Sequence, residues 1–221
     1  MPVLARLRYL PRAIALIMLC VSMISFSAQA GNARPTEASA SSPQGLFIQH
    51  LGDEAIEILK KKDLTKEQRN KTFRNLLDGK FDLKTIARFV IGRNWRSATP
   101  AQQIEYLDLF KKLVVKTYSD RFSLYAGEGF KVRSVSPEGR RDFIVKSDIT
   151  HPDGSKPTVI TWRVRQKDSQ MGIIDVVVEG ISMSVTQRQE YSSVIQRNGG
   201  NIESLLSMMR QRINGNRGTQ S

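Results

Sequence analysis

Apolar residues recur at steps of three and four through the first half of the chain, which is the spacing of amphipathic helices. The pattern predicts helices over about 44–62, 65–79, 83–91 and 100–125. The clearest helix start is Thr99-Pro100-Ala101-Gln102, because threonine can cap a helix, proline suits its first position and glutamine completes a capping box. Gly127 and Gly129 are expected to end this long helix.

After Gly129 the apolar positions alternate, which is the period of a strand with one buried face. Strands are predicted at 130–135, 143–149, 158–165 and 172–178. Their short connections predict an antiparallel meander, and helices are expected to return over 187–197 and 201–213. The predicted fold class is α+β, with a curved four-stranded antiparallel sheet flanked by helices.

The first thirty residues have the features of a secretion signal. Arg6, Arg8 and Arg12 precede an apolar run from Ala13 to Phe26, and Ala28-Gln29-Ala30 is a cleavage motif. The run is shorter than the roughly 20 residues that a membrane-spanning helix needs, so cleavage after Ala30 is favoured over an uncleaved anchor. A lipoprotein at Cys20 is disfavoured because Leu19, rather than a small residue, precedes it.

The predicted organisation follows from this cleavage and from the change in composition near Gln44. It comprises a signal peptide at 1–30, a flexible leader at 31–43, a single domain at 44–213 and a disordered tail at 214–221. The only cysteine leaves with the signal, which excludes a disulfide or a thiolate nucleophile from the mature chain.

Loss of the three signal arginines leaves 31 basic and 21 acidic residues, a net charge of +10. Such a charge favours anionic partners such as lipid headgroups or acidic protein surfaces. Nucleic acid is also an anionic partner, but export makes it the least favoured one. The basic residues are scattered rather than gathered in a nucleic-acid-binding motif. Arg93 and Arg96 are candidates to meet a headgroup, although surface solvation is the favoured role for both.

Candidate catalytic groups do not form a known pattern. His50 and His151 lack a partner at metal-ligand spacing, so we expect no metal site. Ser184 stands where the nucleophile motif G-x-S-x-G requires its second glycine, although a hydrolase that uses Ser182 or Ser184 is kept as a minor alternative. Asp175 is expected to pair with Arg163 or Arg165 across the sheet. No enzymatic activity and no cofactor are therefore expected.

Several segments together resemble one family. They are Phe81–Gln103, with its Ile91-Gly92-Arg93-Asn94-Trp95 centre, then Phe110, Tyr118 and Tyr125, the strand end Ile174–Met183, and Gly199-Gly200. This ordered set, over about residues 45–213, resembles the periplasmic phospholipid-binding component of the lipid-asymmetry (toluene tolerance) ABC transport system. The segment Gln196-Arg197-Asn198-Gly199-Gly200 also resembles the subgroup associated with hopanoid biosynthesis.

The resemblance implies a soluble, monomeric periplasmic carrier with an apolar pocket between the helices and the sheet. Its ligand would be a phospholipid or a hopanoid-type lipid. Its partners would be an inner-membrane ABC lipid transporter complex and an outer-membrane lipoprotein complex. The inward positions of the predicted helices and strands give the candidate lipid-binding residues Phe89, Val90, Trp95, Phe110, Val114, Tyr118, Phe122, Phe143, Val145, Ile160, Trp162, Val164, Ile174 and Val176. An exported, lipid-free adaptor that docks on envelope proteins is the alternative.

Overall fold

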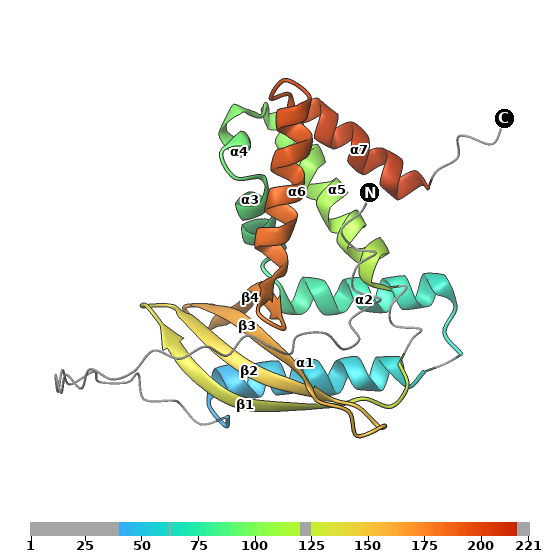
Figure 1. Cartoon of the computed structure of the whole chain (residues 1–221), viewed down its shortest axis with the longest axis vertical. Coiled ribbons are helices and arrows are strands. Elements are labelled where there is room, and N and C mark those ends of the chain that lie inside the picture. Colours follow the sequence, from blue (N-terminus) through green and yellow to red (C-terminus); the bar gives the residue numbers. More distant parts are fainter. Residues whose placement is uncertain (1–39, 62, 120–124, 216–221) are drawn as a thin grey trace, which may run out of the picture. The chain divides into compact units, whose positions relative to one another are not determined.

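The computed structural model describes residues 40–61, 63–119 and 125–215 (Figure 1). The helices are α1 (Pro43–Leu59), α2 (Lys66–Lys80), α3 (Leu83–Ile91), α4 (Asn94–Ser97), α5 (Pro100–Ser119), α6 (Met183–Arg197) and α7 (Ile202–Asn214). The strands are β1 (Gly129–Glu138), β2 (Asp142–Thr150), β3 (Thr158–Lys167), β4 (Gln170–Val178) and β5 (Ile181–Ser182). The predicted signal peptide and most of the predicted leader and tail lie outside the described residues.

Side-chain caps fix where the helices begin. Thr65 and Gln68 form the predicted capping box of α2, and the Asp82 carboxylate accepts a hydrogen bond from the Thr85 amide at the start of α3. The prediction for α6 was wrong by four residues. Its helix begins at Met183 because the Ser182 hydroxyl accepts a hydrogen bond from the Val185 amide and so caps the helix earlier than the apolar pattern indicates.

The end of the long helix also differs from the prediction. The described part of α5 ends at Ser119, and Tyr125 is not helical. The Tyr125 hydroxyl instead donates a hydrogen bond to the carbonyl of Glu128, just before β1. Residues 120–124, and with them Phe122, lie outside the described residues.

The sheet is antiparallel and has the order β1-β2-β3-β4-β5, which confirms the α+β class and the predicted meander. The predicted count of four strands was one too few. The short strand β5 folds back on Val177 and Val178 through a turn in which Glu179 and Gly180 both have positive φ, 48° and 81°. A two-residue strand has no apolar periodicity of its own, so the sequence pattern carried no signal for it.

The helices contact the sheet in two places (Figure 1). α1 packs along β1 and β2, whereas α2, α3 and α6 meet the sheet at β4. A main-chain hydrogen bond strengthens the contact at β4, because the Asp82 amide, just before α3, donates to the carbonyl of Ile173. α5 and α7 pack against each other, as do α3 and α6.

The buried apolar side chains form two large clusters. The sheet cluster joins the sheet to α1 and α2 and contains Ile48, Leu51, Ile58, Leu76, Val132, Val135, Val145, Val164 and Ile173. The helical cluster joins α3, α5, α6 and α7 and contains Ala87, Val90, Ile91, Ala98, Tyr106, Leu109, Phe110, Leu113, Tyr191, Ile195, Ile202, Leu205, Leu206 and Met209. A smaller group, Phe73, Leu77 and Val115, lies between α2 and α5.

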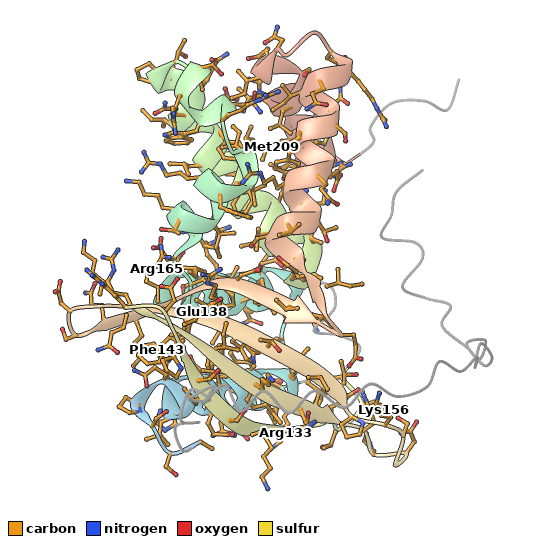
Figure 2. All side chains as sticks on the ribbon, turned by 60° about the vertical axis from the view of Figure 1, so that its left-hand side comes forward. Arg133, Glu138, Phe143, Lys156, Arg165 and Met209 are labelled. Carbon is orange, nitrogen blue, oxygen red and sulfur yellow. The ribbon has the colours of Figure 1, made fainter. Side chains whose placement is uncertain are left out.

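On the face of the sheet opposite the sheet cluster, a buried carboxylate holds β2 to β3. Asp142 accepts hydrogen bonds from Nε and Nη2 of Arg165, at 2.7 and 2.8 Å, and Arg163 lies 3.4 Å away. Figure 2 shows Arg165 on the other side of the sheet from Phe143, as the pairing register requires. The hydrogen bonds from Arg165 lower the pKa of the Asp142 carboxyl, and this effect exceeds the opposing effect of burial.

This lowered pKa makes part of the protein's stability depend on pH. Asp142 has a lower pKa in the folded chain than the roughly 3.9 of an unfolded aspartate, so its contribution is present above about pH 4 and is lost as the pH falls through the folded value. We expect Asp142→Asn to lower the free energy of unfolding by about 1–2 kcal/mol at pH 7 and by less at about pH 3, where the unfolded aspartate is already mostly protonated. Urea unfolding at both pH values measures this difference.

A matched control is Asp78→Asn, which removes a carboxylate from an exposed pair with Lys111. Exposed ion pairs contribute little, so this variant should stay within about 0.5 kcal/mol of the parent at either pH. A loss for Asp142→Asn that is the same at pH 7 and pH 3 would show that the ionised pair with Arg165 is not its source.

Candidate functional site

One face of the sheet forms a continuous apolar surface beneath α1. Val145 and Val164 are fully buried in it, and the register places Val145 opposite Val135 on β1 and Trp162 on β3. We call this surface the sheet core face and define it by the side chains that share the face. They are Val132, Val135, Phe143, Val145, Ile160, Trp162, Val164, Ile173 and Val176.

Two aromatic rings mark the part of this surface that is only half-buried. Phe130 and Trp162 meet edge to face with ring centroids 6.2 Å apart, and both rings pack against the sheet cluster. The Trp162 indole donates a hydrogen bond to the Ser147 hydroxyl at 2.9 Å, which satisfies a polar group that is fully buried. Since the Trp162 indole and the Ser147 hydroxyl pair with each other, the half-buried surface around the two rings suits a hydrocarbon ligand.

The candidate residues on the strands mostly meet at this surface. Val145 and Val164 belong to the sheet cluster, and Phe143, Trp162 and Val176 pack against it. Ile160 is buried opposite Ser147. Ile174 is half-buried and lies outside the cluster, because a register shift between Arg163 and Val164 places Ile173 beside Val164 instead.

The candidate residues on the helices are in a different place. Val90 and Phe110 are buried in the helical cluster, and Trp95 and Val114 pack against it. Tyr118 and Val114 pack against the small group between α2 and α5. Phe89 is 42% exposed, with the Arg188 guanidinium 5.0 Å above its ring. Nine of the fourteen candidates thus belong to or pack against the two large clusters, and Tyr118 packs against the small group. Phe89, Ile160 and Ile174 belong to none of these clusters, and Phe122 lies outside the described residues.

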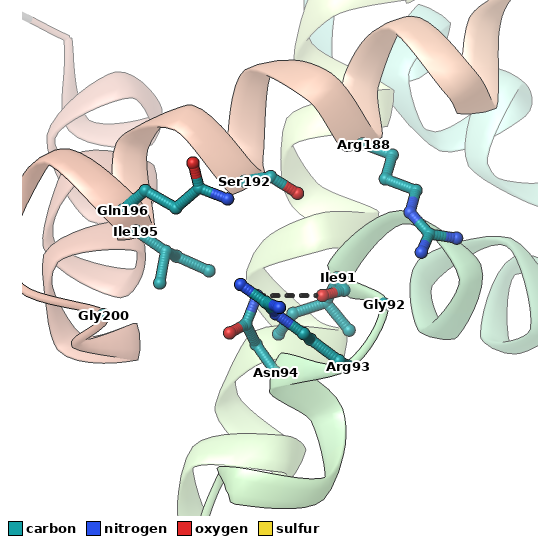
Figure 3. Close-up of a pocket in the computed structure, with 9 residues that line it drawn as sticks. All are labelled: Ile91, Gly92, Arg93, Asn94, Arg188, Ser192, Ile195, Gln196 and Gly200. Carbon is teal, nitrogen blue, oxygen red and sulfur yellow. Dashed lines mark hydrogen bonds between the residues drawn. The ribbon is translucent and has the colours of Figure 1, made fainter.

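A separate pocket of about 300 Å³ lies between the α3–α4 turn and α6 (Figure 3). Its lining contains none of the fourteen candidates. Polar and basic groups line its walls and two isoleucines of the helical cluster contribute apolar surface; the lining residues are Ile91, Gly92, Arg93, Asn94, Arg188, Ser192, Ile195, Gln196 and Gly200. Of these, only Arg93 is a candidate binding residue from the sequence.

The candidate catalytic groups have structural partners. The Ser182 hydroxyl donates to Asp175 at 2.6 Å, and the Ser184 amide donates to the same carboxylate at 3.1 Å. The expected pairing of Asp175 with Arg163 or Arg165 was therefore wrong, because Asp175 anchors the start of α6 while both arginines contact Asp142. His151 contacts the Thr158 hydroxyl at 3.1 Å.

Two features are absent from the described residues. They contain no cluster of three histidine, cysteine or acidic side chains arranged to hold a metal ion. None of the helices in the described ranges combines the length and the apolar character needed to cross a membrane.

Comparisons with known proteins agree with this architecture. A solved structure of a phospholipid-binding protein from Ralstonia solanacearum, in complex with a phospholipid, matches the chain with a TM-score of 0.68 and 20% sequence identity. The match covers 76% of this chain and 96% of that protein, and at this identity it establishes a shared fold. The family model described as MlaC protein matches residues 49–211, which is most of the chain. The chain therefore belongs to the MlaC protein family.

Proposed function

We propose that this protein is a periplasmic phospholipid carrier, exported by a signal peptide at residues 1–30. The carrier would shelter the acyl chains against the sheet core face and move the lipid between the inner and outer membranes. The observation that carries the proposal is the shared fold with a protein whose structure contains a bound phospholipid. Membership of the MlaC protein family points the same way.

The physical need for such a carrier is large. Each exposed methylene group of an acyl chain costs about 0.8 kcal/mol in water, so a lipid with two long chains does not cross an aqueous space unaided. An apolar surface that covers the chains removes this cost without chemistry and without a cofactor. The half-buried rings of Phe130 and Trp162 offer such a surface beside β3.

The place of the acyl chains follows from where α1 is in contact with the sheet. At Gly52 the α1 backbone approaches the ring of Phe130 so closely that even a Cβ atom would overlap it. This contact leaves no room for a chain between α1 and β1 at that point. We therefore assign the chains to the side of β3 and β4, near Trp162 and Val176.

The partners that we propose are those that the family resemblance implies. The carrier would receive or deliver its lipid at an inner-membrane ABC transporter complex and at an outer-membrane lipoprotein complex, and would act as a monomer. The net positive charge of the chain suits anionic headgroups or acidic docking surfaces, with attraction that weakens as salt increases.

The proposal is tested by solvent extraction and mass spectrometry of the protein, purified from a bacterial periplasm without detergent. We expect phospholipid at close to one equivalent, and the spectrum also separates phospholipid from a hopanoid cargo. A folded protein with no lipid would contradict the carrier and favour an adaptor that docks on envelope proteins.

The chain offers a matched pair of variants for locating the lipid. Val176→Met adds volume on the sheet core face, and Val194→Met makes the same change at another half-buried valine, beside the helical cluster. We expect the lipid content to fall several-fold in the first variant only, with both variants folded by circular dichroism. Equal lipid content in the two variants would show that the sheet core face does not hold the chains.

A further inference from the structure

The pocket between the α3–α4 turn and α6 has two guanidinium groups with no neutralising carboxylate. Within the described residues, neither Arg93 nor Arg188 forms an ion pair, although Arg163 and Arg210, elsewhere on the surface, do. α3 and α4 contain no acidic residue, and the one acidic residue of α6, Glu190, is 2.7 Å from Arg212. The charge at this pocket is therefore positive and uncompensated.

The main chain shapes this pocket around the two arginines. Gly92 has a φ of 60°, which allows the chain to turn sharply between α3 and α4. A Cβ on Gly92 would lie 3.1 Å from Nη2 of Arg188, so the glycine leaves room for the guanidinium. The ring of Phe89 also contacts this group, with its centroid 5.0 Å from the Arg188 guanidinium carbon.

Neutral donors complete the lining. Figure 3 shows Ser192 and Gln196 projecting from α6, with Arg93 extending from the turn beneath them in this view. Their spacing of four residues places the hydroxyl and the amide on one face of the helix. The Asn94 amide donates to the Ile91 carbonyl at 3.3 Å, which holds the turn that carries Arg93.

We propose that this pocket binds a phosphate-type anion that carries a small polar group, such as a phosphoglycerol. Guanidinium groups match the geometry of phosphate oxygens and bind them with two hydrogen bonds each, and the hydroxyl and amide add donors to the attached group. The volume of about 300 Å³ is about ten times the roughly 30 Å³ of one water molecule, which leaves space beyond a bare phosphate. The site goes beyond the carrier function, because its lining does not include the sheet core face.

The direct test is a titration of ¹⁵N-labelled protein with glycerol 3-phosphate, followed by NMR, with glycerol as the uncharged comparison. We expect saturable shifts at the amides of Gly92 and Gly200 and none with glycerol. Arg93→Gln and Arg188→Gln should each raise the Kd about tenfold, since each removes a charged hydrogen-bonding group. Arg96→Gln removes an equal charge close by without touching the pocket lining, and should change the Kd less than about twofold.

Two results would overturn the site. One is the absence of saturation at these amides, and the other is an equal loss of affinity in Arg96→Gln, which would indicate diffuse attraction to a basic surface. The source of the phosphate is resolved by sedimentation with phosphatidylcholine vesicles containing phosphatidylglycerol. Vesicle binding that Arg188→Gln abolishes identifies a lipid headgroup, whereas binding of glycerol 3-phosphate alone identifies a soluble ester. Both outcomes are independent of whether solvent extraction of the purified protein yields lipid.

Discussion

Replacing Tyr106 by alanine is expected to lower the free energy of unfolding by about 3–5 kcal/mol. Tyr106 is fully buried at the centre of the helical cluster, with ring centroids 6.4 Å from Trp95, 5.9 Å from Phe110 and 6.4 Å from Tyr191. Truncation would leave a cavity among α3, α5 and α6 that rigid helices cannot close. Urea unfolding followed by circular dichroism measures the loss.

Two further variants separate packing from hydrogen bonding at this site. Tyr106→Phe keeps the ring and removes the hydroxyl, which donates to the Ala87 carbonyl at 2.9 Å, so its cost should be about 1 kcal/mol. Ile104→Ala, on the same helix but 71% exposed, should stay within about 0.5 kcal/mol of the parent. If Tyr106→Phe lost as much stability as Tyr106→Ala, the hydrogen bond rather than ring packing would hold α5 to α3.

Burial also determines the protonation of this aromatic group. It raises the pKa of both Tyr106 and Tyr191 above that of an ordinary tyrosine. Because their folded-state pKa values are raised, both hydroxyls stay neutral in the folded chain as the pH rises through the value of about 10 at which an unfolded tyrosine ionises. Their contribution to stability is therefore complete at neutral pH and decreases only in alkali.

The importance of Tyr106 was not apparent from the sequence, although the helix that carries it was. In the helix predicted over 100–125, Leu107, Phe110 and Val114 recur at steps of three and four. The fully buried side chain is nevertheless Tyr106, whereas Leu107 and Val114 are half-buried. A helix that contacts α2 on one side and α3 and α7 on others buries more than one stripe, so periodicity alone does not rank its faces.

Local signals were the most reliable part of the prediction. The predicted bounds of α3, 83–91, agree with the structure, in which Asp82 caps the start of the helix and Gly92 follows its end. The strands were found for a similar reason, since alternation is a property of neighbouring residues. The start of α6 was missed because the capping Ser182 is held by Asp175, a contact between β4 and the helix.

Placement across the sheet required information that alternation does not contain. The register shift opposite Arg163 moves Ile173 into the sheet cluster and leaves Ile174 outside it, although strict alternation from Val176 favours Ile174. The pocket between the α3–α4 turn and α6 shows the same limit on a larger scale. Arg93 and Arg188 are far apart in the chain, and only the packing of α3 on α6 brings them to one cavity.

Gly52→Leu is expected to lower the free energy of unfolding by about 3 kcal/mol, because the leucine must occupy space that the Phe130 ring fills. Gly79 provides a matched control in α2, since a Cβ built there meets no atom within 4 Å. Gly79→Ala should therefore raise the stability by about 0.5–1 kcal/mol, as expected when a helical glycine gains a side chain without strain. Opposite changes in the free energy of unfolding at the two helical glycines would separate the effect of the Phe130 contact from that of helix propensity.

The variant Phe130→Ala tests the contact from the other side. Alone it should destabilise the protein, because it removes a ring that packs on Trp162 and on α1. In the double variant with Gly52→Leu, the leucine can enter the space that the ring has left, so the double variant should be more stable than the sum of the two losses by at least about 1 kcal/mol. Strict additivity would mean that α1 shifts along the sheet to avoid Phe130, and that space for an acyl chain can open between α1 and β1.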